Sequence, residues 1–175
     1  MSTVLQIYEA IDRLAPFFLS MDFDNTGILV GDRQKKVERA LLALDCTKEV
    51  LRQAKELGAQ LIITHHPIIF HPIKRVNEDS LVYHLLRSDI AVISAHTNLD
   101  IAQGGVNDLL AKRIGLSDCR GLQPMDAQGT FFLGRVGSLP EGMEPQQFAQ
   151  YLKQRLGAPS VKFAAADRTV KTVAL

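Results

Sequence analysis

Three apolar runs separated by helical patterns lie between residues 38 and 115, and they constrain the fold more than any other feature. The runs are at residues 40–44, 61–64 and 90–94, and none of them alternates apolar with polar residues. Such runs are typical of strands that are covered on both faces of a sheet. Segments with helical spacing of apolar residues follow each run. The pattern predicts an α/β fold with a mainly parallel sheet, right-handed connections and flanking helices.

The rest of the chain has a less regular pattern. We expect an α/β metal-site domain over residues 1–120 and a smaller α+β strand-helix-strand portion over 121–175 that packs on it, with residues 121–128 as the linker. The last apolar run ends without a following loop, so we also expect a C-terminal segment to be missing. The other predicted elements are a helix from a Ser2 or Thr3 cap to Pro16, strands at 28–31, 131–136, 161–165 and 170–175, and a helix from Pro145.

Charge and composition exclude several classes of protein. Lys and Arg number 20 against 19 Asp and Glu, for a net charge of +1 without a basic run, so we expect no nucleic-acid partner. The N-terminus has no signal-peptide pattern, and no apolar stretch is long enough to span a membrane. Cys46 and Cys119 are typical of buried thiols in a reducing cytosol. We therefore expect a cytoplasmic protein that binds a small-molecule substrate.

Two of the apolar runs are followed by histidines, at the strand ends where ligands gather in a parallel sheet. His65-His66-Pro67 follows one run, and His96 and Asp100 come after the other. This mixed set of nitrogen and oxygen donors suits Zn, Mn, Fe or Co better than Ca or Mg. Consecutive side chains of a strand point to opposite faces, so both adjacent imidazoles reach one site only if the backbone turns, or else each binds a different ion.

Each of these histidines also has a simpler interpretation. A single histidine at a strand end is usually a capped polar residue without a ligand, but the two motifs together favour metal. His96 has three interpretations: a ligand, a donor that holds Asp100, or a general acid or base beside a metal-bound water. We interpret His71 as a surface imidazole and His84 as a structural residue within a helix. Without a phosphate loop, a GxSxG elbow or a Cys-His pair, nucleophilic catalysis is the minor hypothesis.

Four motifs stand in order along the chain: Asp24–Gly31, Ile62–Pro67, His96–Asp100 and Gly104–Asp108. Together they resemble the Nif-three-like family, whose members are called GTP cyclohydrolase I type 2 homologues. The similarity extends from about residue 5 to residue 175. It implies an α/β fold, a toroidal homohexamer and a dinuclear centre with two divalent metal ions per subunit.

The resemblance also implies roles for the candidate residues. By position, His65, His66 and Asp100 resemble the family's metal ligands, while His96 is our candidate catalytic residue from its place after the strand alone. The family's remaining ligands, a His and a Glu four residues later, have no counterpart in this sequence. We expect a divalent-metal-dependent hydrolase in which metal-activated water attacks a nucleotide or related heterocycle. The alternatives are a metal-dependent phosphoesterase and a non-catalytic, metal-binding hexameric scaffold or interaction protein.

Overall fold

The chain forms two compact units in the computed structural model, which describes residues 1–164 and 167–175. The first unit is Met1–Leu99 and the second is Asp100–Leu175. The division that the sequence suggested, after residue 120, falls within a strand of the second unit. Among the described residues, no helix is both long enough and apolar enough to cross a membrane.

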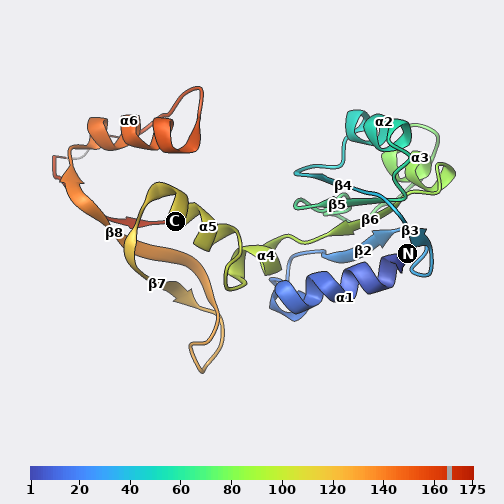
Figure 1. Cartoon of the computed structure of the whole chain (residues 1–175), viewed down its shortest axis with the longest axis horizontal. Helices are drawn as coiled ribbons and strands as arrows, with labels where there is room; N and C mark the ends of the chain where they lie inside the picture. Colours follow the sequence, from blue (N-terminus) through green and yellow to red (C-terminus); the bar gives the residue numbers. More distant parts are fainter. Residues whose placement is uncertain (165–166) are drawn as a thin grey trace. The chain divides into compact units, whose positions relative to one another are not determined.

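The first unit is a four-stranded sheet with helices on both faces (Figure 1). Its elements are β1 (Ser2–Thr3), α1 (Val4–Leu14), a 3-10 turn (Phe17–Leu19), β2 (Gly27–Val30), β3 (Lys36–Val37), β4 (Ala40–Ala43), α2 (Lys48–Glu56), β5 (Leu61–Thr64), α3 (Leu81–Arg87) and β6 (Ala91–Ser94). The strand order is β2-β6-β5-β4, with β4, β5 and β6 parallel and β2 antiparallel to β6. The predicted mainly parallel α/β sheet is confirmed. β1 and β3 form a separate two-stranded sheet.

Alternate residues of the central strands enter two hydrophobic clusters, one on each face of the sheet. Ile62 and Val92 pack against α2 and α3, whereas their neighbours Leu61 and Ile93 pack against α1. All four side chains are fully buried, so burial on both faces explains why these runs show no polar alternation. α1 covers one face and α2 and α3 cover the other (Figure 1).

The strand β4 differs from the other parallel strands because it lies at the edge of the sheet. Its apolar sequence predicts a strand covered on both faces, yet Leu42 is 74% exposed and Leu44, just beyond the strand, is 60% exposed. Leu41 packs into the cluster beneath α2. The α2 face of β4 is therefore covered, while its other face is not, and the prediction of full burial is wrong for this strand.

Two predicted helix boundaries are confirmed. Thr3 caps α1 by accepting a hydrogen bond from the Gln6 N–H at 3.2 Å, and the Gln6 side chain accepts one from the Thr3 N–H at 2.9 Å. This reciprocal capping box satisfies two N–H groups that lack partners inside the helix. α1 ends before Pro16, as expected.

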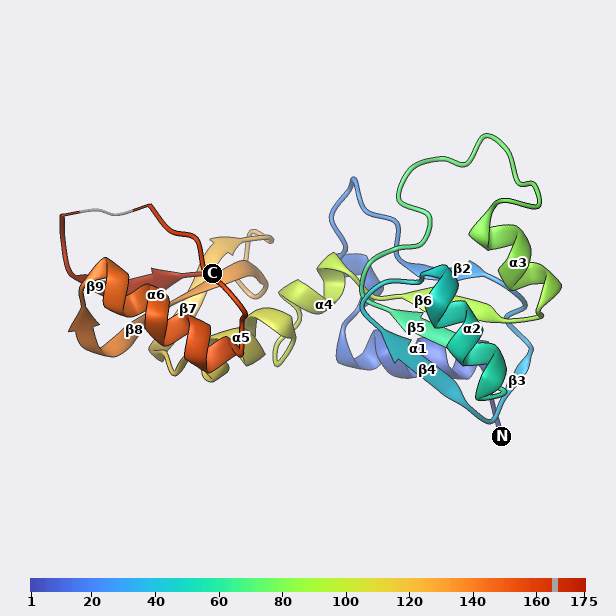
Figure 2. The same cartoon turned by 90° about the horizontal axis from the view of Figure 1, so that it is seen from above.

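The second unit contains a three-stranded antiparallel sheet of order β7-β8-β9 (Figure 2). A short helix, α4 (Thr97–Ile101), leads into it, and the further elements are α5 (Val106–Ile114), β7 (Ser117–Pro124), β8 (Phe132–Met143), α6 (Pro145–Leu156) and β9 (Val170–Ala174). The predicted strand-helix-strand order of this portion is present. The predicted linker at 121–128 begins inside β7, because those residues pair with β8. Residues 161–164 form no strand, and the remainder of that predicted strand lies at residue 165, outside the described part.

Asp108 of α5 and Arg135 of β8 form an ion pair within the second unit. Arg135 Nε and Nη2 donate to the two carboxylate oxygens of Asp108, and Nη1 donates to the carbonyls of Phe132 and Gly134 at 2.9 Å each. The Arg135 hydrogen bonds, with one from the Gly104 N–H, hold the pKa of Asp108 below its usual value despite partial burial. The stability from this carboxylate is therefore present above its unfolded-state pKa and is lost as pH falls through the lower folded-state value.

Replacing Asp108 by Asn should destabilise the protein at neutral pH and have little effect in acid. We expect Asp108→Asn to cost about 2 kcal/mol of unfolding free energy at pH 7, because Arg135 loses its counter-charge. Near the pKa of the folded carboxyl the wild type loses the same interaction, so the two proteins converge. Urea unfolding followed by circular dichroism at pH 7 and in acid measures both values; an equal difference at the two pH values would contradict the assignment.

Candidate metal centre

The carboxyl ends of β5 and β6 lie side by side and deliver the three candidate histidines. Thr64 is in register with Ser94, and their hydroxyl oxygens are 2.8 Å apart in a hydrogen bond. After β5 the chain continues along β4, since the His66 N–H donates to the Leu44 carbonyl at 2.9 Å. His65 and His66 are thereby brought to the same end of the sheet as His96, thirty residues after His66.

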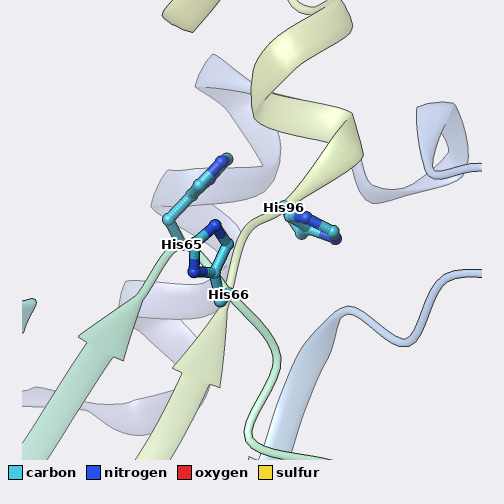
Figure 3. Close-up of side chains that lie close together, drawn as sticks. All are labelled: His65, His66 and His96. Carbon is cyan, nitrogen blue, oxygen red and sulfur yellow. The ribbon is translucent and has the colours of Figure 1, made fainter. Parts of the chain in front are cut away.

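His65, His66 and His96 form a cluster of imidazoles at the carboxyl ends of β5 and β6 (Figure 3). The ring centroids of His65 lie 5.1 Å from those of both His66 and His96, and the last two are 5.6 Å apart. One ligand atom from each residue lies within 4.8 Å of those from the other two. The cluster could therefore hold a metal ion.

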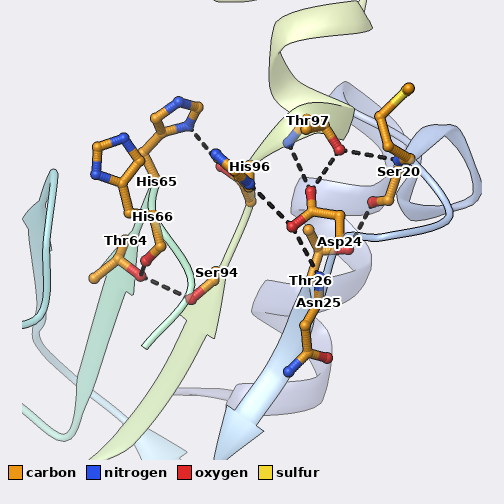
Figure 4. Close-up of polar contacts among 12 residues, drawn as sticks. Ser20, Asp24, Asn25, Thr26, Thr64, His65, His66, Ser94, His96 and Thr97 are labelled. Carbon is orange, nitrogen blue, oxygen red and sulfur yellow. Dashed lines mark hydrogen bonds and ion pairs between the residues drawn. The ribbon is translucent and has the colours of Figure 1, made fainter. Parts of the chain in front are cut away.

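Each imidazole of the cluster is oriented through its Nδ1 atom, and Figure 4 shows this for His96 and Asp24. Nδ1 of His65 lies 2.9 Å from the Ala95 carbonyl oxygen, that of His66 lies 2.7 Å from Asp45 Oδ1, and that of His96 lies 2.9 Å from Asp24 Oδ1. A carbonyl or an ionised carboxylate only accepts, so the proton belongs on Nδ1 and the lone pair of the neutral ring on Nε2. Metal-binding histidines are usually oriented in this way. The donor set thus fits a divalent ion.

Asp24 accepts more hydrogen bonds than Asp45, the other carboxylate that contacts the cluster. Its side chain is fully buried, and it accepts hydrogen bonds from His96, from both the N–H and the hydroxyl of Thr97, and from the Asn25 N–H at 2.8 Å. Burial alone would raise the pKa of Asp24, but these hydrogen bonds outweigh it and lower the pKa below its usual value. Asp24 is therefore a carboxylate that fixes the orientation of His96.

Replacing Asp24 by Asn should release the tautomer of His96. We expect the His96 ring of Asp24→Asn to populate both neutral tautomers, because an amide side chain can donate as well as accept. The nitrogen chemical shifts of the imidazole rings measure this directly in protein without metal. His65 is the internal control, because its Nδ1 is held by the Ala95 carbonyl and should keep its proton. A His96 ring that stays fixed in the variant would contradict this role.

Sequence reasoning gave neither Asp24 nor Asp45 a histidine partner, although both had a signal. Asp24 opens the first motif of the family resemblance, where Asp, Asn and Gly were also compatible with an ordinary turn. Asp45 follows the apolar run at 40–44 as His65 follows the run at 61–64. Neither signal identifies the histidine that each carboxylate contacts, because those contacts depend on the order of strands in the sheet.

The other candidate residues lie elsewhere in the fold. Asp100 lies in the first turn of α4 and is the first residue of the second unit, and its role as a metal ligand stays a prediction. His71 is exposed, and its ring lies 5.0 Å from that of Phe70. His84 lies within α3, against the ring of Tyr83. Neither belongs to the cluster of three histidines.

Comparison with known proteins gives a consistent set of relatives. The sequence pattern of the Duf34/NIF3 (NGG1p interacting factor 3) family matches residues 2–175. A Clostridium perfringens protein named GTP cyclohydrolase 1 type 2 homolog is 37% identical over 97% of this chain, and one from Clostridium acetobutylicum is 33% identical over 91%. The chain spans 66% and 62% of the lengths of these two relatives.

Solved structures agree with the sequence relatives. A Bacillus cereus protein related to NIF3 superposes with a TM-score of 0.92 at 25% identity, covering 99% of this chain and 76% of that one. A Staphylococcus aureus protein, SA1388, gives a TM-score of 0.89 at 27% identity, covering 98% of this chain and 70% of that one. The fold of the whole chain therefore has solved counterparts.

Proposed function

The chain belongs to the Duf34/NIF3 family, and on that premise we propose that it is a divalent-metal-dependent hydrolase. The observation that carries the proposal is the set of three Nδ1 hydrogen bonds in a cluster whose ligand atoms lie within 4.8 Å of one another. Such bonds make Nε2 the ring nitrogen that would bind a metal. Because the chain spans about two thirds of its relatives, the activity of a whole family member is part of the proposal.

The proposed ligands are His65 and His66, with Asp100 as an oxygen donor. Imidazole and carboxylate ligands favour Zn, Fe, Mn or Co. Two ions per subunit, as the family resemblance implies, belong to the same proposal. When bound, such an ion would polarise the bond under attack and lower the pKa of water.

We assign proton transfer to His96. Its side chain is one-fifth exposed and is oriented by the fully buried Asp24, so the ring presents Nε2 in a defined direction. A histidine held in this way can accept a proton at Nε2 while its Nδ1 proton stays bonded to the carboxylate. The competing role for His96 is that of a third nitrogen ligand, which its place in the cluster also favours.

The substrate is proposed from the name of the relatives, GTP cyclohydrolase 1 type 2 homolog. That name suggests GTP or a related heterocycle for those proteins, and we extend the suggestion to this chain. A phosphoester substrate is the near alternative. We propose the reducing cytoplasm as its location, where the thiols of Cys46 and Cys119 would stay free.

A second candidate function is that of a metal-binding assembly protein without turnover. The exposed leucines on and just beyond the edge strand, Leu42 and Leu44, favour it, because an uncovered apolar face is suited to contact with another chain. The homohexamer implied by the family resemblance would be one such assembly. In this function the ions would stabilise the subunit rather than a transition state.

Metal analysis and turnover together separate these functions. We expect the purified chain to bind a divalent ion and to hydrolyse GTP or p-nitrophenyl phosphate only with the ion present. His96→Gln should keep the ion and lose about 100-fold in turnover if His96 transfers a proton. His84→Gln, outside the cluster, is the control. Protein that binds no ion excludes the hydrolase, and bound ion without turnover supports the assembly function.

A further inference from the structure

A cavity of about 380 Å³ lies beside the histidine cluster, with His66 in its wall. The opposite walls come from the segment after β5, through Ile68 and Ile73, and from the start of α3, through Leu81 and Val82. Asp45, which accepts the hydrogen bond of His66 Nδ1, also lines it. A molecule in this cavity would therefore contact one of the three clustered histidines.

The cavity has the size and lining of a small-molecule site. Such sites usually enclose about 300–1,000 Å³ and combine apolar walls with a few polar groups. Most of the side chains that line this one are apolar. Cys46, also in the wall, is partly buried, and this burial raises the pKa of its thiol to about 11.

The charge of the lining restricts what can bind. No lysine or arginine lines the cavity within the described chain, and Asp45 supplies its carboxylate charge. Asp45 Oδ1 accepts the hydrogen bond from His66, and none of the described residues donates to Oδ2. The Asp45 side chain is more than half exposed. An N–H group of a ligand can donate to Oδ2, while a phosphate would face a like charge without a counter-ion.

We propose that this cavity binds the apolar, N–H-bearing end of a small-molecule substrate, neutral or cationic, and excludes its anionic groups. The donor end faces Asp45, and the rest of the substrate extends past His66 toward the other histidines. The assignment rests on the proposed function in that these histidines carry the chemistry. The cavity assignment adds which end of the substrate enters the cavity and that negatively charged groups are excluded from it.

Three probes of nearly equal shape test the charge preference: benzamidine, benzamide and benzoate. Methyl NMR of the 175-residue chain, treated with EDTA, reports binding through the methyl groups of Ile68, Leu81 and Val82. We expect benzamidine to bind with a dissociation constant of about 1 mM, as suits a fragment of this size. Benzamide should bind more weakly than benzamidine, and benzoate should bind at least about tenfold more weakly than benzamidine.

Three variants locate the site. Ile73 is 43% exposed, so Ile73→Trp can fill the cavity from the surface without disturbing the core, and it should weaken benzamidine binding at least about tenfold. Val76→Trp is the matched control, since Val76 is 51% exposed in the same segment but does not line the cavity. Asp45→Asn should weaken benzamidine about tenfold while benzamide binding is kept.

The outcomes separate this assignment from the proposed function. Equal binding of benzoate and benzamidine, an Ile73→Trp protein that still binds, or no shift of the cavity methyl groups would each overturn the assignment. The titration is repeated with Zn²⁺ present. If the chain binds no ion but benzamidine behaves as expected, the hydrolase fails and the cavity stands; if the ion binds and benzamidine does not, only the cavity assignment fails.

Discussion

His65→Ala is expected to lower the affinity for a divalent ion at least about 100-fold, the largest functional effect of any single change considered. Loss of an imidazole removes a ligand outright, whereas loss of a residue that merely orients a ligand typically costs about 10–100-fold. The Ala95 carbonyl would also lose the Nδ1 donor that it accepts from. Competition with a fluorescent zinc chelator measures the dissociation constant.

Two further variants calibrate that result. His84→Ala removes an imidazole from α3, outside the cluster, and should leave the affinity unchanged. Asp45→Asn perturbs only the acceptor of His66 Nδ1 and should fall between the two, at about tenfold. If His65→Ala binds the ion as tightly as His84→Ala does, then His65 is not a ligand and the proposed centre is wrong.

Gly31→Ala is expected to destabilise the first unit by about 3 kcal/mol, the largest effect on stability. Gly31 follows β2 with φ of +96°, a conformation that costs an L side chain about 1–2 kcal/mol. A Cβ built there would also lie 2.7 Å from the Cα of Ala91, which is fully buried in β6. Backbone cannot yield as a flexible side chain does, so the overpacking adds about 1–3 kcal/mol. Urea unfolding followed by circular dichroism measures the loss.

Gly58→Ala separates the two contributions to that loss. Gly58 has φ of +61° in the same unit, but its Cβ would meet only Arg39 Nη1, at 3.9 Å. Gly58→Ala therefore incurs the conformational cost without the clash, and we expect about 1 kcal/mol. Similar losses for the two variants would show that the close approach of β2 to β6 does not matter.

The sequence predicts the parallel core of the first unit because burial on both faces leaves a direct signature in β5 and β6. It does not predict the placement of β4 at the sheet edge, since Leu42 and Leu44 are as apolar as the residues of a covered strand. The antiparallel pairing of β2 with β6 is equally hidden, because strand order depends on long-range packing. The predicted linker at 121–128 overlaps the end of β7, because the largely exposed residues there form a strand only through pairing with β8.

The sequence explains for a similar reason why three histidines lie together, while their role as a metal centre stays a prediction. His65, His66 and His96 stand at strand ends, and the parallel arrangement alone brings strand ends together. Asp24 comes to His96 from a loop preceding β2, across 72 positions of sequence, and only the β2-β6 pairing makes that contact possible. The cavity likewise joins residues from three separate segments, which no local pattern relates.

The junction of β5 and β6 at Thr64 and Ser94 has a consequence for the energetics of folding. The clustered histidines follow these two strands, so an ion bound by them would cross-link segments that are distant in the unfolded chain. By mass action, a ligand at one hundred times its dissociation constant adds about 2.7 kcal/mol to the free energy of unfolding. The melting temperature of this protein would then vary with the free concentration of the ion, and the sheet would be most stable when its histidines bind the ion.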